Sequence, residues 1–413
     1  MPASLKKFVN PKFIRTVDLA LIRTLLQRHD GALKGFDLAT LDGDEARARE
    51  RLHAYLLGAT EQFPEGLIAD LHQIADLGCK AGLELILTHA RRLGVQILEP
   101  AEPDQGDAPK AHDPKHVALR VFLFHRAVFD AAYDFQVLKT KTSLIEFAGL
   151  SEGVAAKTDI SDIERFREAV SVFFEADMRG RYCRLACYED GRDINIVIAH
   201  GAVVSSLPVI EANAERVISM RAVTHAVLRY EKDSGMLRLG GISRTRAPDM
   251  ADMFAGHLLD LPGFFAGPDA RHLYSLDAVE QAGPGFAMTH AHDPAIEAVL
   301  ITTATAELWE WDASSGGRKR VRTRSEKSSS GNVLANLFDV PTPLGGAWRL
   351  CEVGFEVVFK STGKRRDSVS VTLRPPAILR FRRSSHEDRI ITLLQRNGLV
   401  HDRDDLRVIA AAE

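Results

Sequence analysis

The chain has 413 residues, which is long enough for two or three domains that each bury a substantial core. Hydrophobic residues make up 45% and charged residues 26%, as in an ordinary globular protein, and there is no apolar run of about 18 residues that would predict a membrane span. Four cysteines and the lack of a long apolar segment near the N-terminus favour a cytoplasmic protein. The excess of arginine over lysine suggests a bacterial source.

Residues 1–98 are predicted to form a helical bundle. Apolar side chains recur at intervals of three and four residues, and the intervening segments are short. The expected helices cover 19–26, 44–57, 65–77 and 80–93. We interpret this bundle as a docking module for a partner protein or for a second copy of the chain.

Residues 99–117 differ sharply in composition from the bundle. They contain four prolines and five acidic residues but no aromatic residue, so they cannot cover apolar surface. We therefore predict an acidic, proline-rich linker or exposed loop here, and the main domain boundary with it.

The remainder reads as β-hairpins with packed helices. An apolar stretch at 117–135 predicts one buried helix, and a second helix is expected to begin near Ser161. Alternating β-branched and aromatic residues, interrupted by glycine-containing turns, then predict four hairpins. The expected strand pairs are 182–188 with 194–198, 222–230 with 236–239, 298–311 with 320–324, and 348–359 with 368–373. The last expected element is a helix over 386–396.

These elements predict an α+β fold, in which the helical bundle precedes a larger body of mostly antiparallel sheet. Within that body we expect an α+β hairpin and helix domain over 118–285. A basic, β-rich subdomain ending in a helix would cover 286–413.

Charge is distributed unevenly along the chain. Residues 315–383 contain 15 Lys and Arg against 5 Asp and Glu, a net charge of +10, whereas the whole chain has a net charge of −3. The remainder therefore carries −13. A basic segment of this kind favours contact with a polyanion, although pairing with an acidic partner protein, or simple solvation, would explain the same residues.

The arginine and lysine residues form three clusters within this basic segment, and guanidinium groups suit phosphate contacts. If 320–324 is a regular strand, Arg320, Arg322 and Arg324 project from one face. Trp309, Trp311 and Trp348 lie in the same region and could stack on unpaired bases. The candidate nucleic-acid-binding residues are Arg318, Lys319, Arg320, Arg322, Arg324, Lys364, Arg365, Arg366, Arg380, Arg382 and Arg383.

A second candidate site is a loop with two histidines. His290, His292 and Asp293 could coordinate a divalent metal ion, which would indicate a metal-dependent hydrolase or nuclease. The following Pro294 breaks the familiar metallohydrolase spacing, and a histidine pair in an ordinary loop explains the same residues.

Other catalytic signatures are missing from the sequence. There is no phosphate-binding glycine loop and no nucleophile-elbow motif, and we predict no organic cofactor. Cys183 and Cys187 lack a second cysteine pair to complete a zinc site, so core packing is expected of them. The leading hypothesis is thus a non-catalytic, cytoplasmic nucleic-acid-binding subunit of a bacterial multi-protein system. The alternatives are the metal-dependent enzyme and a protein-assembly subunit with no nucleic-acid role.

Overall fold

The computed structural model describes most of the chain and separates it into two compact units. The described residues are 17–58, 63–97, 113–191, 193–211, 214–312, 316–328, 333–338, 348–360, 367–382 and 386–401. The two units are Met1–Val137 and Leu138–Glu413. The expected linker at 99–117 lies largely outside the described residues, so the boundary proposed there stays a prediction.

The first unit is helical, as expected. Its helices are α2 (Leu19–Gln27), α3 (Glu45–Leu56), α4 (Glu65–Leu77), α5 (Lys80–Arg92), α6 (Pro114–Phe124) and α7 (Arg126–Thr140), with short 3-10 turns η2 (Asp30–Ala32) and η3 (Leu38–Asp42). Asp18, Asp44 and Asp113 accept backbone N–H hydrogen bonds at the helix N-termini. Helix α6 contacts α2, α4 and α5, and the apolar faces of these helices are buried.

The stretch predicted as one helix over 117–135 forms two. Helix α6 ends before His125, which adopts φ −135° and ψ 57°, outside the helical region, and α7 begins at the next residue. The His125 carbonyl accepts hydrogen bonds from the N–H groups of Val128 and Phe129, so the chain restarts as a helix at once. Neither proline nor glycine marks this break, which explains why periodicity alone missed it.

The second unit contains one large antiparallel sheet. Its strands are β1 (Ser143–Ala148), β2 (Cys183–Asp190), β3 (Asp193–Gly201), β6 (Val223–Glu231), β7 (Met236–Gly240), β8 (Ile296–Asp312), β9 (Gly317–Lys327), β10 (Trp348–Phe359), β11 (Asp367–Arg374) and β12 (Ile378–Phe381). Within the described residues the strand order is β2-β3-β6-β7-β1-β12-β11-β10-β8-β9. A separate ribbon pairs β4 (Ser205–Glu211) with β5 (Ala214–Met220). The α+β class is confirmed, and so are the four predicted hairpins.

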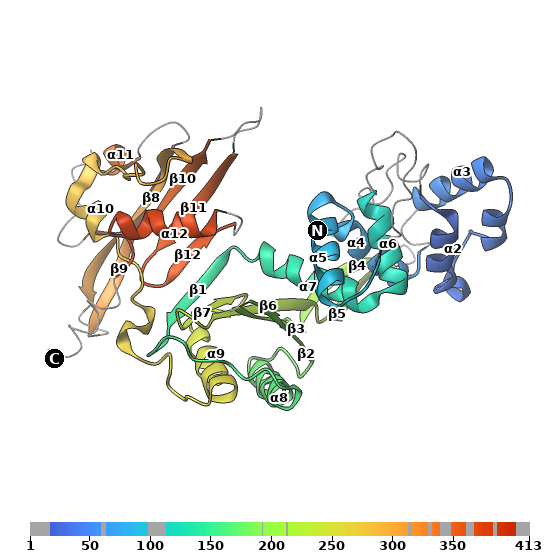
Figure 1. The fold of residues 1–413 in the computed structure, drawn as a ribbon, viewed down its shortest axis with the longest axis horizontal. Helices are drawn as coiled ribbons and strands as arrows, with labels where there is room; N and C mark the ends of the chain where they lie inside the picture. The colour runs from blue at the N-terminus through green and yellow to red at the C-terminus, as the bar shows by residue number, and fades with distance from the viewer. Residues whose placement is uncertain are drawn as a thin grey trace. The chain divides into compact units, whose positions relative to one another are not determined.

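Two hydrophobic cores cover opposite faces of this sheet (Figure 1). One, the α8–α9 core, packs α8 (Ile160–Ala176), α9 (Ala247–Phe254) and the π turn η5 (Ala255–Leu259) on β3, β6 and β7. The other, the α10–α12 core, packs α10 (Asp277–Ala282), α11 (Leu334–Phe338) and α12 (Glu387–Arg396) on β8, β10, β11 and β12.

Strand β1 shows how the two cores share one sheet. Its side chains alternate: Ile145 and Phe147 pack in the α8–α9 core, whereas Ala148 packs against the α10–α12 core. β1 lies between β7 and β12, so the face that carries the α8–α9 core continues, in the other half of the sheet, as the face opposite the α10–α12 core. In the described residues no helix is long and apolar enough to cross a membrane.

Candidate nucleic-acid interface

The hairpin of β8 and β9 brings exposed tryptophans beside arginines. Trp309 lies opposite Arg320, and Trp311 lies opposite Arg318. Residues directly opposite in an antiparallel pair project from the same face, so these four side chains share one surface, which we call the Trp–Arg face. Trp311 is 69% exposed and Trp309 is 39% exposed, which is unusual for side chains of this size.

A β-bulge at Val321 divides the predicted arginine row between the two faces of the sheet. The register shifts between Leu308 and Trp309, so Arg322 lies opposite Leu308 and not on the side of Trp309. The prediction that Arg320, Arg322 and Arg324 project from one face is therefore wrong. The inserted residue reverses the alternation after Arg320.

Three other basic residues of β9 lie on the opposite face of the sheet, the face that carries the α10–α12 core. Arg324 lies opposite Ala306, which is buried in the α10–α12 core, and its guanidinium donates to the Asn336 carbonyl of α11 at 3.3 Å. Lys319 and Arg322 lie on this same face of β9 by register. Of the five candidate residues between Arg318 and Arg324, only Arg318 and Arg320 thus lie on the same face as the tryptophans.

Charge on the Trp–Arg face is only partly neutralised. Arg320 donates to the Glu307 carboxylate at 2.9 Å. The Arg318 side chain has no hydrogen-bond or ion-pair partner among the residues that the structure describes. An exposed guanidinium without a carboxylate, next to an exposed indole, is suited to a phosphate and an adjacent base.

Two further arginines, which the sequence prediction did not include, extend this surface. The Glu307 carboxylate that binds Arg320 also lies 4.0 Å from the Arg374 guanidinium. Burial, followed by the charges of Arg374 and Arg380, lowers the pKa of Arg244, so these three cations lie close together. Arg374 and Arg380 come from β11 and β12, and Arg244 comes from the turn after β7.

The remaining predicted residues are only partly placed. Arg380 is exposed and shares its face of β12 with Ile378, two residues earlier. Arg382 is exposed directly after β12. Lys364, Arg365, Arg366 and Arg383 lie outside the described residues.

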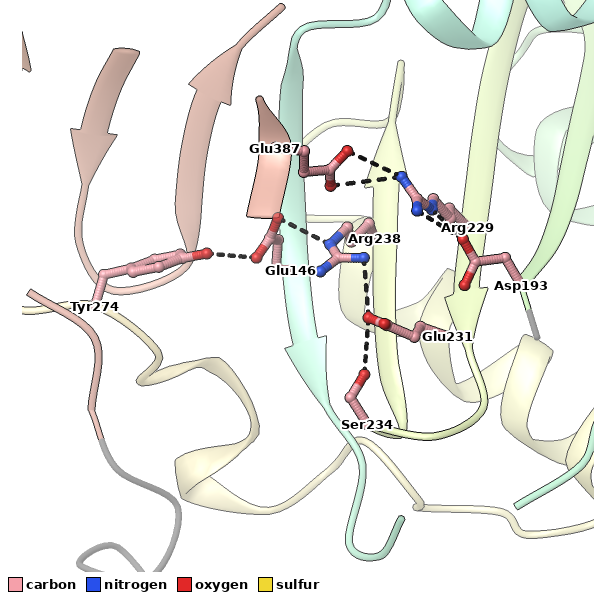
Figure 2. A network of polar contacts seen from close by, with 8 residues as sticks. All are labelled: Glu146, Asp193, Arg229, Glu231, Ser234, Arg238, Tyr274 and Glu387. Carbon is pink, nitrogen blue, oxygen red and sulfur yellow. Dashed lines mark hydrogen bonds and ion pairs between the residues drawn. The ribbon is translucent and has the colours of Figure 1, made fainter. Parts of the chain in front are cut away.

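The opposite face carries a very different set of arginines (Figure 2). Arg238 on β7 contacts Glu146 at 3.2 Å and Glu231 at 3.4 Å. Arg229, directly across on β6, contacts Asp193 at 2.6 Å and Glu387 of α12 at 3.2 Å. We call these residues, together with Tyr274 and Ser234, the interior network.

The interior network is internally saturated. Burial disfavours the charged guanidinium of Arg238, but Glu146, Glu387 and Glu231 more than offset this, so its pKa is raised. The Glu146 carboxylate is 1% exposed and also accepts the Tyr274 hydroxyl, which leaves it no access to a substrate. The network ties α12 and the Tyr274 loop to β1, β6 and β7, which is a structural role.

The histidine loop is not assembled as a metal site. One Asp293 oxygen accepts the Ala295 N–H at 2.9 Å and lies 3.4 Å from the Arg389 guanidinium. No group of three His, Cys, Asp or Glu side chains that could hold a metal ion occurs in the described part of the chain, which includes His290 and His292. The predicted ligand set is therefore not brought together, because Asp293 is used in the turn that opens β8.

The cysteines of β2 are packing residues, as predicted. Cys183 and Cys187 pack against the α8–α9 core. Burial raises the pKa of each thiol to about 11, so both remain protonated near neutral pH. Neither is suited to be a nucleophile or a metal ligand.

Comparison with known proteins adds no family. No protein-family model matches the chain, and no curated protein sequence is significantly similar to it.

Proposed function

We propose that this chain is a non-catalytic nucleic-acid-binding protein that holds a single strand on the Trp–Arg face. The observation that carries the proposal is the pairing of exposed Trp309 and Trp311 with Arg320 and Arg318 on one face of β8 and β9. Aromatic rings accept bases of any sequence, and guanidinium groups contact the phosphates between them.

The cellular setting is proposed on composition alone. We infer a cytoplasmic protein of a bacterial multi-protein system, in which the helical unit docks a partner protein or a second copy. The cysteine content and the arginine-rich composition support this setting.

The bulge at Val321 supplies a matched pair of variants for the test. Arg318→Gln removes a charge from the Trp–Arg face, and Arg322→Gln removes the same charge from the same strand on the opposite face. Binding of a fluorescein-labelled oligothymidylate to the full chain is measured by anisotropy from about 50 to 200 mM salt, the range in which phosphate contacts weaken steeply.

We expect Arg318→Gln to weaken binding and to reduce the slope of log K against log salt by about 0.7, the value for one phosphate contact on a single strand. Arg322→Gln should leave the slope unchanged. Trp311→Ala should weaken binding by about 1–3 kcal/mol, because one stacked base is lost. Equal effects of the two arginine variants, or no binding at about 50 mM salt, would contradict the proposal.

A further inference from the structure

A cavity of about 230 Å³ opens on the same face of the sheet as the Trp–Arg face. It lies over β1 and β12, where the α8–α9 core ends. Since one water molecule occupies about 30 Å³ of liquid, the cavity has room for an organic group as well as an ion. Its lining residues are Ile145, Phe147, Arg244, Arg271, His272, Pro375, Pro376, Ala377 and Ile378.

The floor of this pocket is apolar and already formed. Ile145 of β1 lies directly opposite Ile378 of β12, so their side chains stand together on the pocket face. Phe147, two residues along β1, is fully buried in the α8–α9 core. The N–H of Leu273 and the N–H of Tyr274 both donate to the Pro376 carbonyl at 2.9 Å, which fixes the loop carrying Arg271 and His272. A flat apolar group could lie on this floor without rearrangement.

Two exposed guanidinium groups and a histidine form the rim, and none of these side chains is in contact with a carboxylate of the described residues. Arg244, Arg271 and His272 make no hydrogen bond or ion pair with any residue that the structure describes. The charges of Arg374 and Arg380 act on Arg244, as do the carboxylates of Glu352 and Glu307. Glu307 is already shared by Arg320 and Arg374. An anion that enters the pocket would therefore meet guanidinium groups that have no carboxylate in contact with them among the described residues.

We propose that this pocket binds an organic phosphate, with the phosphate held by Arg244 and Arg271 and the attached ring lying on Ile145 and Ile378. A bare inorganic anion would leave the apolar floor uncovered, and a neutral ligand would leave the rim without a counterion. Two sources share this chemistry, a free nucleotide and the 5′-phosphate end of a bound strand. The second source rests on the proposed function, because contacts from Arg374 through Glu307 to Arg320 connect the pocket with the Trp–Arg face.

The first arm of the test titrates the full chain with adenosine 5′-monophosphate, adenosine and inorganic phosphate, using calorimetry at low salt. We expect the monophosphate to bind more tightly than either fragment. Arg244→Gln and Arg271→Gln should each weaken it at least tenfold. Arg396→Gln, an exposed arginine on α12 on the other side of the sheet, serves as the matched control and should bind as the natural chain does.

The second arm compares a short oligothymidylate that carries a 5′-phosphate with one that carries a 5′-hydroxyl. Tighter binding of the phosphorylated strand, lost in Arg244→Gln, assigns the pocket to a strand end. Binding of the monophosphate without such a preference assigns it to a free nucleotide. If neither the monophosphate nor the 5′-phosphate responds to Arg244→Gln and Arg271→Gln, the inference is overturned.

The two proposals fail separately. If oligonucleotide binding depends on Arg318 but not on the 5′-phosphate, and the monophosphate does not bind, the proposed function stands and the pocket proposal is wrong. If the monophosphate binds in a way that depends on Arg244, but no oligonucleotide binds at low salt, the pocket proposal stands and the proposed function is wrong. The midpoint of thermal unfolding is measured for each variant, and an unchanged midpoint shows that the substitution has not disrupted the fold.

Discussion

The two faces of one sheet use arginine in opposite ways. In the interior network, Arg229 and Arg238 each contact two carboxylates, so their positive charges are fully compensated within the protein. On the other face, Arg244, Arg318 and Arg380 have no such partner among the described residues. The residue type is the same in both sets, so the presence of carboxylates in contact is what distinguishes an arginine that stabilises the fold from one that is available to a ligand.

The largest expected effect is in the interior network. Glu146→Ala removes the buried carboxylate in contact with the Arg238 guanidinium and leaves the Glu231 contact at 3.4 Å, which should lower the free energy of unfolding by about 3–5 kcal/mol. Urea denaturation measures this change. Glu310→Ala, an exposed glutamate on β8, is the matched control and should change stability by less than about 0.5 kcal/mol. Similar losses in the two variants would contradict the distinction between the faces.

A buried histidine should make stability depend on pH. His200 stacks on Phe174 with ring centroids 3.6 Å apart, and burial lowers its pKa from 6.5 to about 4; Arg179, His225 and Lys141 add to the lowering. The unfolded chain therefore binds the proton first as the pH falls. Stability should be complete above pH 6.5 and should fall toward pH 4, by about 3 kcal/mol at about 1.4 kcal/mol per pH unit.

The measurement for His200 is the free energy of unfolding between pH 7 and pH 4, compared with His200→Gln. The variant starts less stable, because it loses the stacked ring, but its decline over this range should be shallower. Parallel declines of the two proteins would show that other groups cause the pH dependence.

A smaller effect is expected where α12 joins the network. Glu387→Gln keeps the shape of the side chain but removes the charge that faces Arg229. Since this pair is only partly buried and Arg229 retains Asp193, we expect a loss of about 1 kcal/mol. A double-mutant cycle with Arg229→Gln should give a coupling energy of the same size, and a coupling near zero would show that the contact contributes nothing.

The smallest effect should have the opposite sign. Arg244 lies near Arg374 and Arg380, so Arg244→Gln relieves repulsion between like charges. Because Arg244 is exposed and solvent screens it, we expect a gain of only about 0.3 kcal/mol, which should disappear in high salt. A clear loss of stability would place Arg244 among the structural arginines and not among those available to a ligand.

Secondary structure followed from the sequence because it depends on local spacing. The turn at Gly235, which adopts φ +60° between β6 and β7, is an example, since the glycine and the flanking β-branched residues were sufficient to predict the hairpin. The break at His125 and the bulge at Val321 were missed, because neither has a compositional mark.

The candidate site depended on long-range arrangement and was only partly predictable. The basic segment and its tryptophans could be identified as a candidate binding region from the sequence alone. Arg244 lies near Arg374 and Arg380 because β1 pairs with both β7 and β12 in the sheet. No local sequence pattern predicts this pairing. The burial and pairing of Arg238 have no mark in the sequence, because its partners Glu146 and Glu231 come from two other strands.

The position of β9 at the margin of the described sheet has a consequence for handling the protein. An unpaired outer strand offers its backbone to the outer strand of another molecule, and crowded positive charge is a known deterrent to that kind of fibril-like pairing. Five basic residues lie between Arg318 and Arg324, so neutralising one of them leaves the deterrent in place. Neutralising all five should promote edge-to-edge aggregation, and the resulting loss of solubility would then be mistaken for a loss of binding.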